Sequence, residues 1–136
     1  HENADCTSRQ LIRGVLDDKA RGVFQGRGRV APDAQKTDGQ QMSRALLLSR
    51  DAEADAKPEL EIFADDVVCS HGATVGELDE TLLFYLKSRG IGEAEARTML
   101  IDAFLVDTLE EISYQPFADF LRDQVSGWTA RQTGVE

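Results

Sequence analysis

A cysteine and a histidine two residues apart are the side chains of this sequence whose types and spacing best suit chemistry. Cys69 and His71 open the stretch CSHGATVG (69–76). Residues two apart on a β-strand project from the same face, so this thiol and imidazole could reach one soft or borderline metal ion. Two ligands do not complete a metal site, so the remaining ligands would have to come from distant sequence or from another chain.

Other interpretations of these residues stay open. Cys69 can be a small buried side chain and His71 a hydrogen-bonded strand end. A Cys–His nucleophile pair is disfavoured, because neighbours on one strand face diverge and no oxyanion-hole arrangement is visible. The pair Asp65–Asp66 could serve as the acid and base of a polysaccharide-acting enzyme. Adjacent strand residues point to opposite faces, however, so the sequence favours a turn at this pair.

The composition bounds the class of protein. The chain has 136 residues, of which 41% are hydrophobic, which suits one core with an appendage. A net charge of -10 disfavours nucleic-acid binding. The apolar runs are far shorter than a bilayer requires, so we expect no membrane span. Two cysteines favour a reducing compartment, with the cytoplasm as the expected location. Because the chain begins at His1, we expect it to be a piece of a longer one.

The sequence predicts two regions that meet at Gly76. Residues 1–76 read as short strands separated by turn formers, with a tight turn at 17–19 and a solvated connection, AQKTDGQQ, at 34–41. Within residues 13–30 the triplet RGV occurs at 13 and again at 21, each time before a large apolar residue, Leu16 or Phe24. Later strand candidates are 44–49, 59–63 and 66–71. Their spacing is too short for intervening helices. A sandwich and a solenoid both remain open.

Residues 77–136 read as helical. Thr74 and Glu77 have the spacing of a capping box, and Gly90 has the position of a left-handed helix end. A second helix is predicted over about 93–112, and a third is opened by Pro116. The polar tail from residue 129 is expected to fray. The first helix carries more apolar residues than one narrow stripe can hold, so the strands or a partner protein should cover part of it.

Several segments of the sequence resemble the SufD branch of the SufB/SufD family, which belongs to the SUF system of iron–sulfur cluster assembly. The resembling segments are AQKTD (34–38), LLLS (46–49), KPELEIFADDVVCSHGATVGELDE (57–80) and LFYLKSRGI (83–91). The resemblance runs over about residues 1–112 and covers the C-terminal portion of the family's usual chain. Ser70 and Gly72 flank His71, where SufB-like sequences typically carry acidic residues, and this favours the SufD branch.

The resemblance implies a mainly β fold with C-terminal helices. Residues 1–76 would be the end of a truncated right-handed parallel β-helix, and residues 77–136 a small α-helical domain. The implied function is that of a non-catalytic scaffold, which pairs with a SufB-like protein and docks a SufC-like ATPase. His71 would be the ligand at the interface and Cys69 the second candidate. Iron or an iron–sulfur cluster would be held there transiently and not bound stably by the isolated chain.

Three further expectations accompany this interpretation. Tyr85 and Arg89 are chosen as ATPase-contacting residues, because aromatic and arginine side chains dominate protein interfaces. The isolated chain should form a homodimer, since the end of a β-helix exposes an unpaired edge. The alternative function is a β-helical metalloenzyme or carbohydrate-acting enzyme that uses Asp65, Asp66 or His71.

Overall fold

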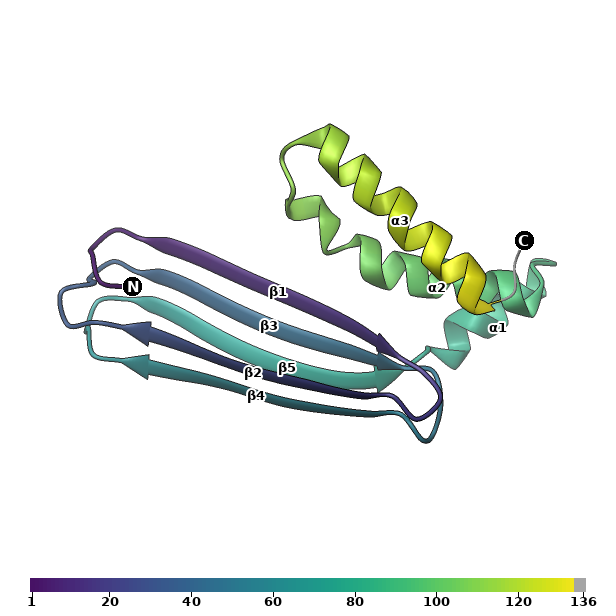
Figure 1. Ribbon diagram of the computed structural model, residues 1–136, viewed down its shortest axis with the longest axis horizontal. Coiled ribbons are helices and arrows are strands. Elements are labelled where there is room, and N and C mark those ends of the chain that lie inside the picture. The colour runs from purple at the N-terminus through teal and green to yellow at the C-terminus, as the bar shows by residue number, and fades with distance from the viewer. Residues whose placement is uncertain (134–136) are drawn as a thin grey trace. The chain divides into compact units, whose positions relative to one another are not determined.

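The computed structural model describes residues 1–133 and divides the chain into two compact units. The first spans His1–Gly76 and the second begins at Glu77. Strands make up the first unit and helices make up the second (Figure 1). No helix within residues 1–133 is long and apolar enough to cross a membrane.

The first unit contains five strands of ten residues each. They are β1 (Thr7–Leu16), β2 (Arg21–Val30), β3 (Asp38–Leu47), β4 (Glu53–Ile62) and β5 (Val68–Glu77). Successive strands alternate between two sheets, a first sheet with the order β1-β3-β5 and a second with the order β2-β4. The β1–β3 and β2–β4 pairs are parallel. Each strand therefore lies beside the strand two further along the chain.

The turns between strands explain why the chain changes sheet so abruptly. Asp18 has a φ of 53° and Lys36 a φ of 63°, both in the left-handed region that reverses the chain within a few residues. Asp17 supports the first of these turns, because its side chain accepts a hydrogen bond from the Asp18 amide and its carbonyl accepts one from Ala20. The turn predicted at 17–19 is confirmed.

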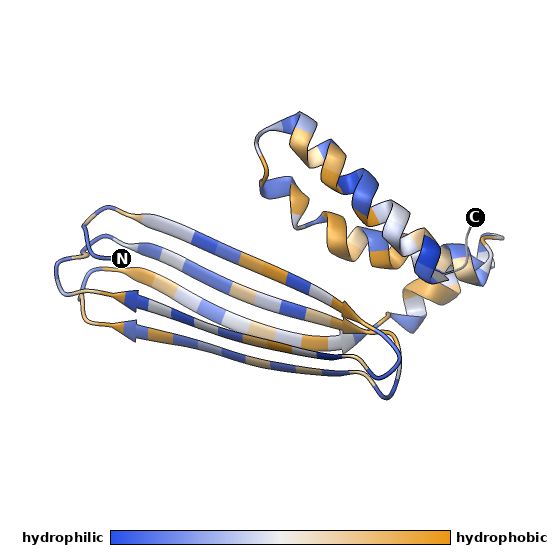
Figure 2. Ribbon diagram, in the orientation of Figure 1, coloured by the Kyte–Doolittle hydropathy of each residue, from blue (hydrophilic) through white to orange (hydrophobic). Residues whose placement is uncertain are grey.

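Small and polar side chains fill much of the space between the sheets. Val30, Ala34 and Ala64 form a buried cluster, against which Cys69 packs. Hydrophobic and hydrophilic residues alternate in short stretches along the strands (Figure 2). Strands with this pattern present one face to the interior and the other to water. The first unit therefore has a thin core.

The prediction of a solvated connection at 34–41 is wrong for its second half. Strand β3 begins at Asp38, and Thr37, Gly39 and Gln41 are buried. Two of the buried polar groups have partners, since the Thr37 hydroxyl donates to the Ala34 carbonyl at 2.8 Å and Gln41 Nε2 donates to Gln10 Oε1 at 2.8 Å. A buried polar group costs little when it is hydrogen-bonded, so hydropathy alone misreads this stretch.

The second unit is a set of packed helices. They are α1 (Glu80–Ser88), α2 (Glu93–Val106), the 3-10 helix η1 (Leu109–Glu111) and α3 (Gln115–Thr133). Helix α2 contacts both α1 and α3. Ile101 of α2 is 1% exposed, and burial of such a side chain contributes about 1.5–3 kcal/mol. Gly90 follows α1 with a φ of 86°, which confirms the predicted left-handed helix end.

Three predictions about the helices are wrong. Thr74 and Glu77 form no capping box, because strand β5 continues through both and the cap of α1 is Asp79. The second helix ends at Val106 instead of near residue 112. Residues 129–133 continue α3, where Thr129 is buried and its hydroxyl donates to the Val125 carbonyl. The rest of the tail predicted to fray lies outside the described residues.

Candidate functional site

Cys69 and His71 both lie on β5, the last strand in the order of the first sheet. Because side chains alternate along a strand, the two residues project from the same face. Their exposure differs, since Cys69 is half-buried and His71 is exposed. The Cys69 sulfur points between the sheets, where a Cβ placed on Gly39 would lie 3.4 Å from it. The same strand face therefore carries an inward thiol and an accessible imidazole.

The arrangement of the strands accounts for the exposure of His71. The first sheet has three strands and the second has two, so the second sheet ends at β4 within the described chain. Beyond Cys69, the residues on the same face of β5 are exposed, namely His71, Ala73 and Val75. We conclude that this face of β5 has no facing strand among residues 1–133.

The His71 imidazole also makes no polar contact within the described part of the chain. Across the described part of the chain, no hydrogen bond or ion pair involves its side chain. No group of three or more His, Cys, Asp or Glu residues lies close enough to hold a metal ion within residues 1–133. Both ring nitrogens of His71 are thus open to an external ligand, while the described residues supply half a metal site at most.

The pair Asp65–Asp66 lies in an exposed turn between β4 and β5. The Asp66 carboxylate forms an ion pair with Lys36, whose pKa it raises through this hydrogen bond and through its charge. The Asp66 amide donates to the side chain of Gln35 at 3.0 Å. These contacts connect the turn between β2 and β3 with the turn between β4 and β5, so the structure supports the turn interpretation of this pair.

Tyr85 and Arg89 lie together at the end of α1. The Arg89 guanidinium carbon is 4.9 Å from the centre of the Tyr85 ring, within the range of a cation–π contact. Tyr85 is 52% exposed and Phe84 is 73% exposed, whereas Leu83 is buried within the helical unit. Helix α1 therefore presents an aromatic and cationic surface in addition to the side that packs on α2.

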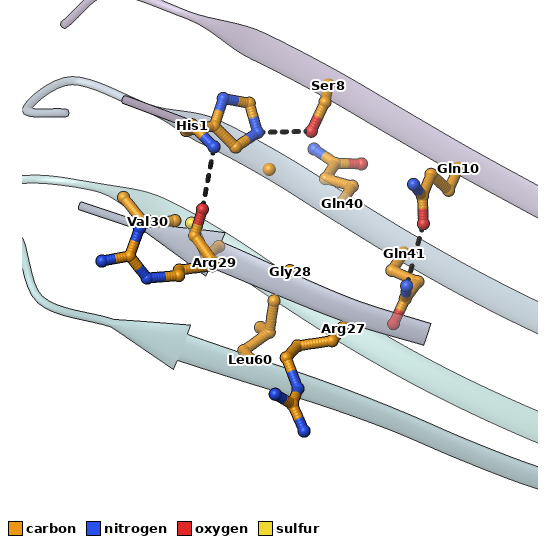
Figure 3. Close-up of a pocket in the computed structure, with 12 residues that line it drawn as sticks. His1, Ser8, Gln10, Arg27, Gly28, Arg29, Val30, Gln40, Gln41 and Leu60 are labelled. Atoms are coloured by element: carbon orange, nitrogen blue, oxygen red, sulfur yellow. Dashed lines mark hydrogen bonds between the residues drawn. The ribbon is translucent and has the colours of Figure 1, made fainter. Parts of the chain in front are cut away.

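The structure also contains a cavity that sequence reasoning missed. It has a volume of about 250 Å³ and lies between the two sheets, where its wall includes His1, Ser8, Gln41 and Cys69 (Figure 3). The His1 Nε2 atom lies 2.7 Å from the Ser8 hydroxyl oxygen. A usable signal was present in the sequence, because Ser8, Gly39 and Cys69 recur at intervals of 31 and 30 residues, close to one strand-to-strand repeat.

Comparison with known proteins identifies the class. Residues 1–104 match the family model described as "SUF system FeS cluster assembly, SufBD core domain". The match covers well over half of the chain, so the chain belongs to the SufBD family of iron–sulfur cluster assembly proteins.

Individual relatives carry related names. The iron-sulfur cluster assembly protein SufD of Escherichia coli is 50% identical over 112 residues, which are 82% of this chain and 26% of that protein. An iron-sulfur cluster assembly SufBD family protein of Synechocystis is 44% identical over 86% of this chain and 26% of its own length. Protein ABCI7, chloroplastic, of Arabidopsis thaliana is 40% identical over 88% of this chain and 26% of its own. The chain thus spans about a quarter of the length of these relatives.

Proposed function

We propose that this chain is part of a non-catalytic scaffold for iron–sulfur cluster assembly, in which His71 binds iron or a nascent cluster at an interface with a SufB-like protein. The exposed and unpaired imidazole on the last strand of the first sheet is the observation that carries this proposal. Membership of the SufBD family supplies the biochemical setting.

The strand unit suits such an interface if its strands follow successive coils of a right-handed parallel β-helix, in which each coil contributes one strand to each sheet. The alternation of strands between two parallel sheets supports this architecture, as does a constant pairing offset: Thr7 pairs with Asp38 and Leu16 with Leu47. In a β-helix, β5 would be the start of a coil whose second strand is absent from residues 1–133. A partner strand could then pair with the free edge of β5, by the mode known as β-augmentation.

Imidazole is a suitable ligand for a transfer site. Iron–sulfur clusters are held mainly by thiolates but also accept imidazole as a ligand. A transfer site must release its cluster, and an imidazole can give up the metal by taking a proton. His71 supplies one ligand, and we propose that the SufB-like partner supplies the others. Cys69 is the second candidate on this chain, although its sulfur points inward towards Gly39.

We propose that the helical unit docks a SufC-like ATPase through the exposed side of α1. Tyr85 and Arg89 are the proposed anchors, because a large ring stacked with a guanidinium buries much area with little loss of side-chain freedom. The exposed Phe84 side chain beside them extends the apolar part of this surface. We place this assembly in the cytoplasm, where reducing conditions keep Cys6 and Cys69 as the free thiols that the structure shows.

The test is co-expression of the full-length protein with its SufB-like and SufC-like partners, comparing His71→Ala with Ser70→Ala. Ser70 is exposed on the same strand but projects from the opposite face, so it is the matched control. We expect both variants to co-elute with the partners. His71→Ala should lower the iron and sulfide content of the purified complex at least tenfold, whereas Ser70→Ala should leave it unchanged. Cluster content retained in His71→Ala would remove the proposed ligand role.

A further inference from the structure

Strands β3 and β5 pair in a register that places residues 30 positions apart opposite each other. The Val68 amide donates to the Thr37 carbonyl at 2.8 Å, and in a parallel ladder this bond sets Val68 opposite the next residue, Asp38. At the other end of the interval, a Cβ on Gly72 would lie 2.9 Å from Met42 Cε. Both observations give the same offset, so each residue from 38 to 42 lies beside the residue 30 positions later.

His71 is therefore the neighbour of Gln41 across the sheet. Gln41 is 6% exposed and projects between the two sheets, where a Cβ on Gly26 of β2 would meet its amide. His71 projects from the same inner face of β5 as Cys69. Neighbouring strands lie about 4.8 Å apart, so an imidazole and an amide that share a face at paired positions are within hydrogen-bonding reach of each other.

The Gln41 amide is held with its nitrogen towards β1 and its oxygen away from β1. Its Nε2 donates to Gln10 Oε1 at 2.8 Å, and β1 and β5 flank β3 on opposite sides. Figure 3 shows the amide nitrogen of Gln41 turned towards Gln10 and the amide oxygen turned away. That oxygen, Oε1, is buried and has no hydrogen-bond partner among the described residues. A buried acceptor without a donor is unfavourable, so a donor on the β5 side would be stabilised there.

We propose that Gln41 is a positioning residue for His71, with its Oε1 accepting a hydrogen bond from His71 Nδ1. Nδ1 is the ring nitrogen nearer to the strand, whereas Nε2 lies at the outer tip of the ring. A hydrogen on Nδ1 leaves Nε2 unprotonated, and Nε2 is then the atom presented to iron or a cluster. Within residues 1–133 the imidazole makes no polar contact, so the bond forms by rotation of an exposed side chain, which changes rotamer freely.

Metal-binding histidines commonly have such a partner. Their second ring nitrogen donates to a carbonyl, a carboxylate or a water, which fixes the tautomer and the ring orientation and makes the ligating nitrogen more basic. A neutral histidine in water carries its hydrogen mainly on Nε2, the atom that must be free to bind. Gln41 reverses this preference, so the imidazole is ready to bind before a partner arrives. This role of Gln41 rests on the ligand role proposed for His71.

The tautomer of His71 can be measured without metal or partner. The chain contains two histidines, so ¹⁵N labelling of histidine gives two sets of ring signals, and His71→Ala identifies the set that belongs to His71. The ring is neutral in mildly alkaline solution. Protonated and unprotonated ring nitrogens then differ widely in ¹⁵N chemical shift. We expect the hydrogen mainly on Nδ1 in the unmodified chain.

Three variants separate positioning from a purely structural role of Gln41. Gln41→Met has about the same length but no amide oxygen, so the hydrogen of His71 should return mainly to Nε2. Gln41→Glu keeps an acceptor at this position and should keep the hydrogen on Nδ1. Gln40→Met is the matched control, because Gln40 is exposed on the opposite face of β3, and it should leave the tautomer unchanged. Circular dichroism checks that each variant is folded.

The same variants of the full-length protein, in complex with its SufB-like and SufC-like partners, test the consequence for binding. We expect Gln41→Met to co-elute with the partners but to hold iron about tenfold less tightly against a competing chelator, with Gln41→Glu close to the unmodified complex. A hydrogen mainly on Nε2 in the unmodified chain, an unchanged tautomer in Gln41→Met, or iron held equally tightly by that variant would overturn the inference. Cluster content retained in His71→Ala would instead remove the proposed function, so the two failures are distinguishable.

Discussion

Gln41 and Gln10 are register partners in neighbouring parallel strands, and their side-chain amides are joined directly, with Gln41 Nε2 donating to Gln10 Oε1 at 2.8 Å. This pair lets the thin interior of the strand unit contain a glutamine that is 6% exposed. The packing around it is close, because a Cβ at Gly26 of the opposite sheet would lie 2.2 Å from Gln41 Nε2. We therefore expect the amide pair to stabilise the unit.

Replacement of Gln10 by alanine should destabilise the strand unit by about 1–3 kcal/mol, because the buried Gln41 amide then loses its acceptor. Urea denaturation followed by circular dichroism would measure the change in free energy of unfolding. The control is Gln25→Ala on β2, an exposed position for which we expect a change within about 0.5 kcal/mol. Equal stabilities of the two variants would show that the pair contributes nothing.

The residue that caps the N-terminus of α1 in the structure differs from the one that the sequence predicts. Asp79 accepts hydrogen bonds from the amides of Thr81 and Leu82 at 2.8 Å and 3.2 Å. Asp79→Ala should therefore destabilise the helical unit by about 1 kcal/mol, as is typical for loss of a helix cap. Thr74→Ala should leave the helical unit unaffected, since Thr74 belongs to β5. Thermal unfolding of the two variants distinguishes the caps, and a larger loss in Thr74→Ala would restore the capping-box interpretation.

An ion pair across the loop between α1 and α2 should make the stability of the helical unit depend on pH in the acid range. Glu93 has a pKa below its ordinary value of 4.5, because Lys87 donates a hydrogen bond to its carboxylate and adds a favourable charge. A carboxyl whose pKa is lower in the folded state stabilises the fold above its unfolded pKa. That stabilisation is lost as the pH falls through the lower folded value.

We expect the melting temperature of the unmodified chain to exceed that of Glu93→Gln near neutral pH, and the difference to shrink once the pH falls below about 4.5. Both groups are exposed, so added salt should also reduce the difference. Differential scanning calorimetry at several pH values measures it. A difference that stays constant from pH 7 to pH 3 would rule out the ion pair as its cause.

The uncovered face and edge of β5 should make the isolated chain self-associate. Val75 is 49% exposed on this strand, and unpaired strand edges readily accept another strand. We expect a dimer in light scattering, and we expect Val75→Lys to shift the population towards monomer because a charge at the contact opposes pairing. Val23→Lys is the control, since Val23 is also exposed but lies on β2. A monodisperse monomer for the unmodified chain would contradict this expectation.

Some features of the chain could be predicted from the sequence because they depend on neighbouring residues. The turn at 17–19 and the left-handed residue at Gly90 are of this kind, since local backbone sterics and short hydrogen bonds decide both. The strands of the first unit were located by their apolar runs, although their ends were misplaced. The placement of Cys69 and His71 on one strand face also follows from local alternation alone.

Tertiary structure decided the features that depend on register between strands about 30 residues apart. Gln41 reads as solvated by hydropathy, yet it is buried because Gln10 meets it across the sheet. The cavity beside Gly39 arises in the same way, from side chains that only the pairing of β1, β3 and β5 brings together. The exposure of His71 follows from the count of strands in the two sheets. Local propensity carries no information about such non-local contacts. The sequence alone therefore indicates which residues are polar, whereas the fold determines which of them come into contact.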